Sequence, residues 1–166
     1  MATSTYNLIA STTVGSGGAS SITFLSIPGT YTDLVLKISV RESTTNSSVA
    51  YISFNGVTTN RSEIKLQGNG SSASSSTSTD IQFIDNASTD TANSFSNAEL
   101  YIPNYTSSNY KSICSDSVAE NNSSTAFMRL TASLWSSTAA ITQIAITANS
   151  NLAQYSTAYL YGIKNS

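Results

Sequence analysis

The sequence predicts an all-β protein, an antiparallel β-sandwich of about ten short strands in one domain that spans residues 1–166. Three observations predict this fold. Apolar and polar residues alternate with a period of two in several short segments, and Gly, Pro and Asn separate the segments. No stretch of about ten residues carries a helical stripe. The jelly-roll and immunoglobulin-like strand orders both agree with this pattern.

The first half of the chain has five expected strands with clear boundaries. The glycine-rich segment 15–18 links the first two, and Pro28, which cannot donate to a sheet, ends the second. The third places aliphatic residues at even positions and Lys37 on a wet face. Asn55-Gly56 after the fourth is a strong hairpin signal. The expected strands are 6–12, 21–27, 34–41, 49–54 and 62–67.

The second half opens with a Ser-rich segment, 68–79, whose composition predicts a flexible loop within the domain. Alternation resumes after it, and a polar loop follows at 85–94. Segment 128–134 is expected to turn Arg129 toward water, and Trp135 continues that polar register. The expected strands are 80–84, 98–102, 110–115, 128–134, 141–147 and 155–163.

Composition excludes several classes of protein. Ser and Thr make up about a third of the chain, while charged residues make up 10%, against about a quarter in average domains. The net charge of −2 with 7 Lys+Arg argues against a nucleic-acid partner. No apolar run is long enough to span a membrane, and the N-terminal residues predict no secretory signal.

The sequence favours a protein that is not an enzyme and has no cofactor. It contains no His, the commonest general base and metal ligand. Ser108 and Lys111 have the bare Ser-x-x-Lys spacing, but Lys111 is expected to be solvated. Cys114 has no His partner and is expected to be a small, half-buried filler. The oxygen-rich loop 85–90 lacks the calcium-loop order, so whether it binds a cation stays open.

Aromatic residues are the candidates for partner contact. Tyr101 and Trp135 are expected on wet strand faces, and Tyr155, Tyr159 and Tyr161 on one side of the last strand. Such side chains suit protein interfaces because they offer large contact area at low entropic cost, and they can also stack on sugar rings. The candidates are Tyr101, Tyr105, Trp135, Tyr155, Tyr159 and Tyr161.

A resemblance runs through nearly the whole chain. The segments that carry it are 31–36 (YTDLVL), 52–56 (ISFNG), 98–105 (AELYIPNY), 116–122 (DSVAENN) and 160–163 (LYGI). They resemble small structural proteins of tailed bacteriophages, notably marine and cyanobacterial ones. The resemblance implies a virion component and supplies no functional residues.

These observations lead to one expected function and two alternatives. The expected function is a capsid decoration (cement) protein that assembles in the host cytoplasm and binds the phage major capsid protein or other virion proteins. The class of protein favours a homo-oligomer, with a trimer preferred. The first alternative is a tail-fibre or receptor-binding module for host surface glycans. The second is a carbohydrate-active enzyme that uses two of the nine Asp and Glu residues.

Overall fold

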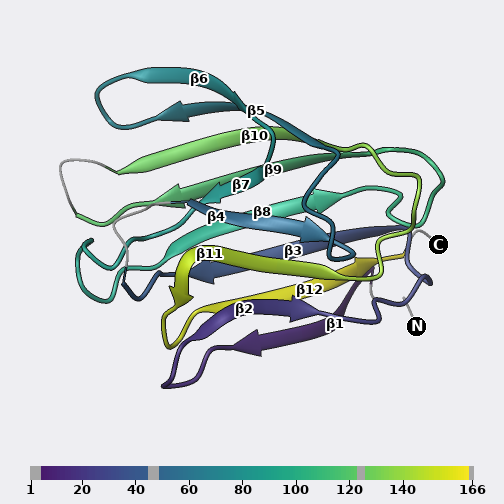
Figure 1. The fold of residues 1–166 in the computed structure, drawn as a ribbon, viewed down its shortest axis with the longest axis horizontal. Helices are drawn as coiled ribbons and strands as arrows, with labels where there is room; N and C mark the ends of the chain where they lie inside the picture. Colours follow the sequence, from purple (N-terminus) through teal and green to yellow (C-terminus); the bar gives the residue numbers. More distant parts are fainter. Residues whose placement is uncertain (1–4, 45–48, 123–125, 165–166) are drawn as a thin grey trace.

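The computed structural model describes residues 5–44, 49–122 and 126–164, and within these residues the chain is all β. Twelve described strands form two antiparallel sheets, one packed over the other (Figure 1). This confirms the predicted β-sandwich. None of the described residues belongs to a helix that could cross a membrane.

The two sheets differ in size. Sheet A has eight strands, which in spatial order are β1 (Tyr6–Thr13), β12 (Thr157–Ile163), β3 (Asp33–Val40), β8 (Ser96–Ile102), β9 (Lys111–Ala119), β10 (Phe127–Trp135), β5 (Arg61–Gly68) and β6 (Ala73–Ser78). Sheet B has four, which are β2 (Ala19–Phe24), β11 (Ile144–Leu152), β4 (Val49–Phe54) and β7 (Ile81–Ile84).

Eight of these strands follow the jelly-roll order. Taken in chain order, these eight strands, β1, β2, β3, β4, β7, β8, β11 and β12, alternate between sheet A and sheet B, except that β4 and β7 both lie in sheet B. The resulting rows, β1-β12-β3-β8 and β2-β11-β4-β7, are the two four-stranded sheets of a jelly roll. This strand order separates the fold from the immunoglobulin-like alternative.

Two hairpins extend sheet A beyond the jelly roll. Hairpin β5–β6 is inserted between β4 and β7, and hairpin β9–β10 between β8 and β11. Together they add the row β9-β10-β5-β6 beside β8, which we call the extension. Figure 1 shows β10, β5 and β6 at one end of the molecule. In the part of the chain that the structure describes, sheet B has no strand beyond β7 to match them.

Strand β6 lies within the segment that the sequence predicts as a flexible loop. It pairs with β5 from Glu63↔Ser78 to Gly68↔Ala73. The side chain of Asn69 accepts the backbone amides of Ser71 and Ser72, at 3.1 and 2.8 Å, and so closes the turn. A Ser-rich composition fits an edge strand as well as a linker, because neither needs an apolar face.

The apolar core lies between the sheets. The aliphatic side chains at the even positions of β3 and β8 point into it, as the alternation of 34–41 and 98–102 predicts. Phe54 and Trp135 meet across the sandwich with ring centroids 5.4 Å apart. Gly162 on β12 leaves room for the ring of Tyr31, since a Cβ at this position would lie 2.3 Å from it.

Asn55 and Gly56 form the tight turn that the sequence predicts, although not a hairpin. Both residues have positive φ, 53° and 71°, and the amide of Val57 donates to the carbonyl of Phe54 at 2.9 Å. The chain then crosses from β4 in sheet B to β5 in sheet A, so the strands on either side of the turn do not pair.

Candidate functional site

The outer face of sheet A is the candidate site, because aromatic and aliphatic side chains collect on it. Cross-strand pairing places outward residues of successive strands in rows. One row runs Leu66, Leu130, Asp116, Glu99, Lys37, Tyr159, and the next runs Ile64, Ala132, Cys114, Tyr101, Val35, Tyr161. The rows divide the face into an apolar half on the extension and a tyrosine-rich half on the jelly roll.

The apolar half consists of side chains from β5, β10 and β9. We call the group Ile64, Leu66, Cys114, Met128, Leu130 and Ala132 the apolar patch. Ile64 is 64% exposed, Met128 68% and Leu130 60%. A shallow hollow of about 350 Å³ lies among these residues. Monomeric proteins rarely leave so many large aliphatic side chains together in water.

The inner face of the same strands is polar, the reverse of the usual arrangement. Arg129, Thr131 and Ser133 are buried under sheet B, while Met128, Leu130 and Ala132 point outward. The prediction that Arg129 faces water is therefore wrong. An alternating strand of this kind is compatible with either orientation, and only its tertiary surroundings choose between them.

The free edge of β7 explains why the inner face is polar. Strand β7 is the edge strand of sheet B. Among the described residues, the backbone amides on its free edge therefore have no strand to pair with. Glu63 Oε2 accepts the amide of Gln82 at 2.7 Å, and Ser117 Oγ accepts the amide of Ile84 at 3.1 Å. Polar side chains from sheet A thus satisfy donors that burial would otherwise leave unpaired.

Charged groups support this inner layer. Lys65 Nζ lies 3.7 Å from Glu63 Oε1 and donates to Gln82 at 2.8 Å, and Arg129 donates to Gln67 at 2.7 and 3.1 Å. Burial raises the pKa of Glu63 and lowers the pKa of both Lys65 and Arg129. Glu63 and Lys65 thus hold Gln82 of β7, Arg129 ties β10 to β5 through Gln67, and the aliphatic residues beside them face out.

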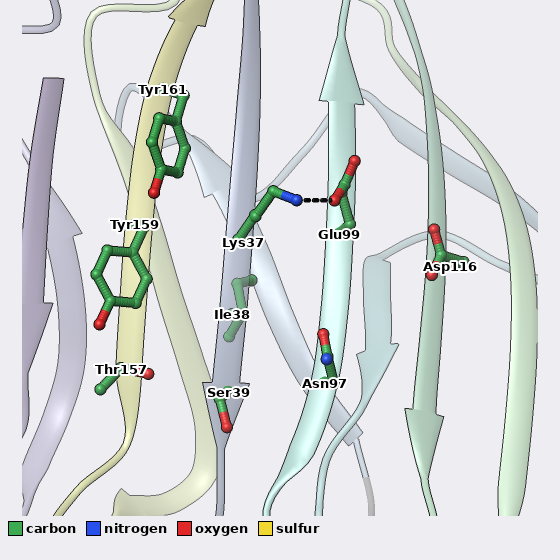
Figure 2. A pocket seen from close by; sticks show the side chains of 9 residues that line it. All are labelled: Lys37, Ile38, Ser39, Asn97, Glu99, Asp116, Thr157, Tyr159 and Tyr161. Atoms are coloured by element: carbon green, nitrogen blue, oxygen red, sulfur yellow. Dashed lines mark ion pairs between the residues drawn. The ribbon is translucent and has the colours of Figure 1, made fainter. Parts of the chain in front are cut away.

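The tyrosine-rich half contains a larger hollow of about 510 Å³. We call it the tyrosine hollow; Figure 2 shows Tyr159 and Tyr161 on β12, Lys37 on β3, Glu99 on β8 and Asp116 on β9 around it. Lys37 Nζ and Glu99 Oε2 form an ion pair of 2.7 Å, and the hydrogen bond to Glu99 raises the pKa of Lys37. Tyr159 and Tyr161 share one side of the last strand, as the sequence predicts, and this side is the outer one: Tyr159 is 40% exposed and Tyr161 is half-buried.

Tyr101 lies on the outer face, as predicted, and is 37% exposed. Its hydroxyl donates to Asp33 Oδ2 at 2.9 Å, and this hydrogen bond raises its pKa. Asp33 Oδ1 also accepts the amide of Asn104 at 2.8 Å. The ring of Tyr101 remains available for contact, whereas its hydroxyl is bonded to Asp33, which also holds the turn after β8.

Two predicted contact residues are instead in the core. Trp135 is 1% exposed because it shares the inner face of β10 with Arg129, so the same reversal overturns both predictions. Tyr105 is fully buried after β8, and its hydroxyl donates to the carbonyl of Pro28. Burial raises the pKa of this hydroxyl.

Lys111 is buried rather than solvated. Its Nζ donates to the carbonyls of Ser107, Ala139 and Ser137, at 2.7, 2.6 and 3.2 Å, and lies 5.6 Å from the centroid of the Trp135 ring. Burial lowers its pKa. It therefore ties two loops together, and its hydrogen bonds are to backbone carbonyls rather than to Ser108.

Tyr155 and Cys114 also differ from expectation. Tyr155 is 67% exposed, but it lies in the turn before β12 with φ of 72° and does not share the strand face of Tyr159. Cys114 is exposed on β9 within the apolar patch, not half-buried. Its outward position follows from the pairing with Ala132.

A buried carboxyl pair escapes prediction from the sequence. Asp85 and Glu42 are both fully buried; the neighbouring Glu42 carboxyl and, above all, burial raise the pKa of Asp85 to about 8. Within the described residues, neither side-chain oxygen of Asp85 accepts a hydrogen bond from another residue. A protonated Asp85 can itself donate to Glu42, which accounts for the pairing. The two residues are 43 positions apart in the sequence, and no sequence pattern connects them.

The loop that follows Asp85 is held by protein groups. Arg41 donates to the carbonyls of Ser88, Asp90, Thr91 and Ser94 at 2.9–3.0 Å, and Asp90 Oδ2 accepts the amide of Ala87 at 2.8 Å. In the ranges that the structure describes, no three His, Cys, Asp or Glu side chains gather as metal ligands.

The residues that the sequence misses are the aliphatic members of the patch. Ile64, Leu66 and Leu130 lie in alternating segments, and the pattern alone leaves open which side of each segment faces the core.

Comparison of the chain with models of protein families, with characterised proteins and with solved structures gives no match.

Proposed function

We propose that the chain is a structural protein of a tailed-bacteriophage virion, a capsid decoration protein that strengthens the shell through protein–protein contacts. The observation that carries this proposal is the apolar patch. The charged side chains of β5 and β10 point inward while large aliphatic ones point out, and Asp116 on β9 is a charged residue at the border of the patch. Exposed apolar surfaces of this kind mark sites of contact with another protein. The resemblance of the sequence to phage structural proteins supports the same function.

A second copy of the chain is the occupant that the patch fits. Its members carry no charge, so two patches can meet with Asp116 left at their border. The outer face of the whole extension, which adds the uncharged Ser and Thr residues of β6 to the patch, has four strands spaced about 4.8 Å apart and eight residues long, at about 3.3 Å each, and so measures roughly 500 Å². Two such faces bury about 1,000 Å², the smallest area expected of a specific interface.

The proposed assembly is a homo-oligomer that seats on the major capsid protein. Two patches that meet directly make a dimer, and in the trimer that the class of protein favours the patches meet around a threefold axis. Either way, each patch is covered by a neighbouring copy, and loops at the ends of the sandwich remain free to contact the shell. Strand pairing that is non-local throughout the jelly roll makes each copy a rigid unit, which suits a load-bearing role.

The copy number and place on the particle test this proposal. Purified virions of the encoding phage are analysed by quantitative mass spectrometry and imaged with an antibody fragment against the chain. A decoration protein occurs at hundreds of copies spread over the head. A handful of copies confined to the tail tip would contradict the proposal and favour a tail-fibre or receptor-binding module, the alternative to which the tyrosine hollow lends support.

A further inference from the structure

The tyrosine hollow is a second surface feature, which differs from the apolar patch in composition and borders it at β9, where Asp116 pairs with Leu130. It crosses four adjacent strands, β12, β3, β8 and β9, at the centre of sheet A. Its volume of about 510 Å³ is in the range of ligand sites. Because the lining residues lie on paired strands and not on loops, their positions are fixed before any ligand arrives.

One side of the hollow is aromatic. Tyr159 and Tyr161 lie two residues apart on β12, so their rings are about 7 Å apart along the strand. Figure 2 shows both rings lying over the strand with their hydroxyls directed toward the same end of it. Within the described residues, no protein group forms a hydrogen bond with the Tyr159 hydroxyl, in contrast to that of Tyr101.

The other side is polar and offers both donors and acceptors. The amide of Asn97 can donate and accept, and the carboxylate of Asp116 can accept. Lys37 and Glu99 neutralise each other through their ion pair, so the hollow carries a net charge of about −1. That charge disfavours phosphate, sulfate and other anionic ligands.

We infer that the tyrosine hollow binds a neutral oligosaccharide. The C–H faces of successive sugar rings stack on Tyr159 and Tyr161, where the electron-rich ring faces attract them. Asn97 and Asp116 form hydrogen bonds with sugar hydroxyls. Lys37 and Glu99, which lie between Tyr159 and Asp116, supply further hydrogen-bonding groups. This inference does not depend on where the protein sits on the particle.

The test is titration of the isotope-labelled full chain with defined neutral hexasaccharides of glucose, mannose, galactose and N-acetylglucosamine, followed by NMR. A heparin hexasaccharide serves as the anionic comparison. At least one neutral probe is expected to bind in the millimolar range or tighter and to shift backbone signals of β12, β3 and β8. Absence of binding by all four neutral probes, or binding of heparin alone, would overturn the inference.

Substitutions locate the site. Tyr159→Ala is expected to weaken binding of the same probe about tenfold, the loss of one stacked ring. Tyr155→Ala removes a more exposed tyrosine outside the hollow and is expected to leave affinity unchanged. Asn97→Leu, which keeps size but removes hydrogen bonds, reports on the polar side. Equal effects of Tyr159→Ala and Tyr155→Ala would place the sugar elsewhere and contradict the inference.

Discussion

Asp85 carries the strongest pH dependence expected of a single residue. Its pKa of about 8 lies above the ordinary value of 3.8. Between these two pH values the unfolded chain loses the proton of Asp85 while the folded chain keeps it. The free energy of unfolding therefore falls as pH rises through this window, by up to about 1.4 kcal/mol per pH unit from this group.

We expect Asp85→Asn to remove this dependence, because the amide keeps a donor for Glu42 and does not ionise. Urea unfolding at pH 4, 6 and 8 measures it. The variant gains stability relative to the wild type as pH rises, with little difference at pH 4. Asp116→Asn, which replaces an exposed carboxylate, is the control and should leave the free energy of unfolding unchanged at all three pH values. A constant difference between Asp85→Asn and wild type at all three pH values would contradict this account.

Trp135 tests whether the reversed register of β10 is correct. Because its ring packs on Phe54 in the core, Trp135→Ala is expected to cost about 3–5 kcal/mol of stability. Tyr155→Ala, at an exposed turn, should stay within about 0.5 kcal/mol. Thermal unfolding measures both. A small effect at Trp135 would instead indicate a surface ring, as the sequence predicts.

At the scale of elements, β7 depends on side chains from the opposite sheet. Ser117→Ala removes the acceptor of the Ile84 amide and leaves that donor buried, at a cost of about 1–3 kcal/mol. Hydrogen exchange of the Ile84 amide is expected to become faster than in the wild type. Ser112→Ala, an outward serine on the same strand, should change neither stability nor this exchange rate. Unchanged exchange at Ile84 in Ser117→Ala would show that another acceptor holds β7.

The strands themselves could largely be predicted, because local alternation and turn residues determine where a strand begins and ends. The segment 34–41 illustrates this, with its aliphatic side turned inward as expected. The side of a strand that faces the core could not be predicted where both sides have a reason to be buried. In β10 the polar side faces the buried layer in which Glu63 on β5 and Ser117 on β9 accept the amides of β7, and this layer forms only when distant segments meet.

The same physical limit applies to the candidate site. Tyr159 and Tyr101 could be predicted, since each shares a strand with aliphatic residues on the opposite side. The patch could not, since its members come from β5, β10 and β9, and only the cross-strand register brings Ile64, Ala132 and Cys114 into one row. Strand β6 was hidden by a composition that an edge strand and a linker share.

At the scale of the whole molecule, the protein is a jelly roll with an added four-stranded extension whose outer face is apolar. The jelly roll holds the tyrosine hollow, and the extension holds the patch. The central claim is that another copy of the chain covers this patch. A substitution that disrupts the patch would therefore change the assembly of the protein without changing its fold.

Light scattering coupled to size-exclusion chromatography tests this claim most directly. The wild type is expected to elute as a multiple of 17.4 kDa, with three copies favoured. Leu130→Ser, in the patch, should give monomers, whereas Leu25→Ser, at an equally exposed leucine elsewhere, should not. A wild type that remains a monomer at micromolar concentrations, or an oligomer that Leu130→Ser leaves intact, would contradict the account.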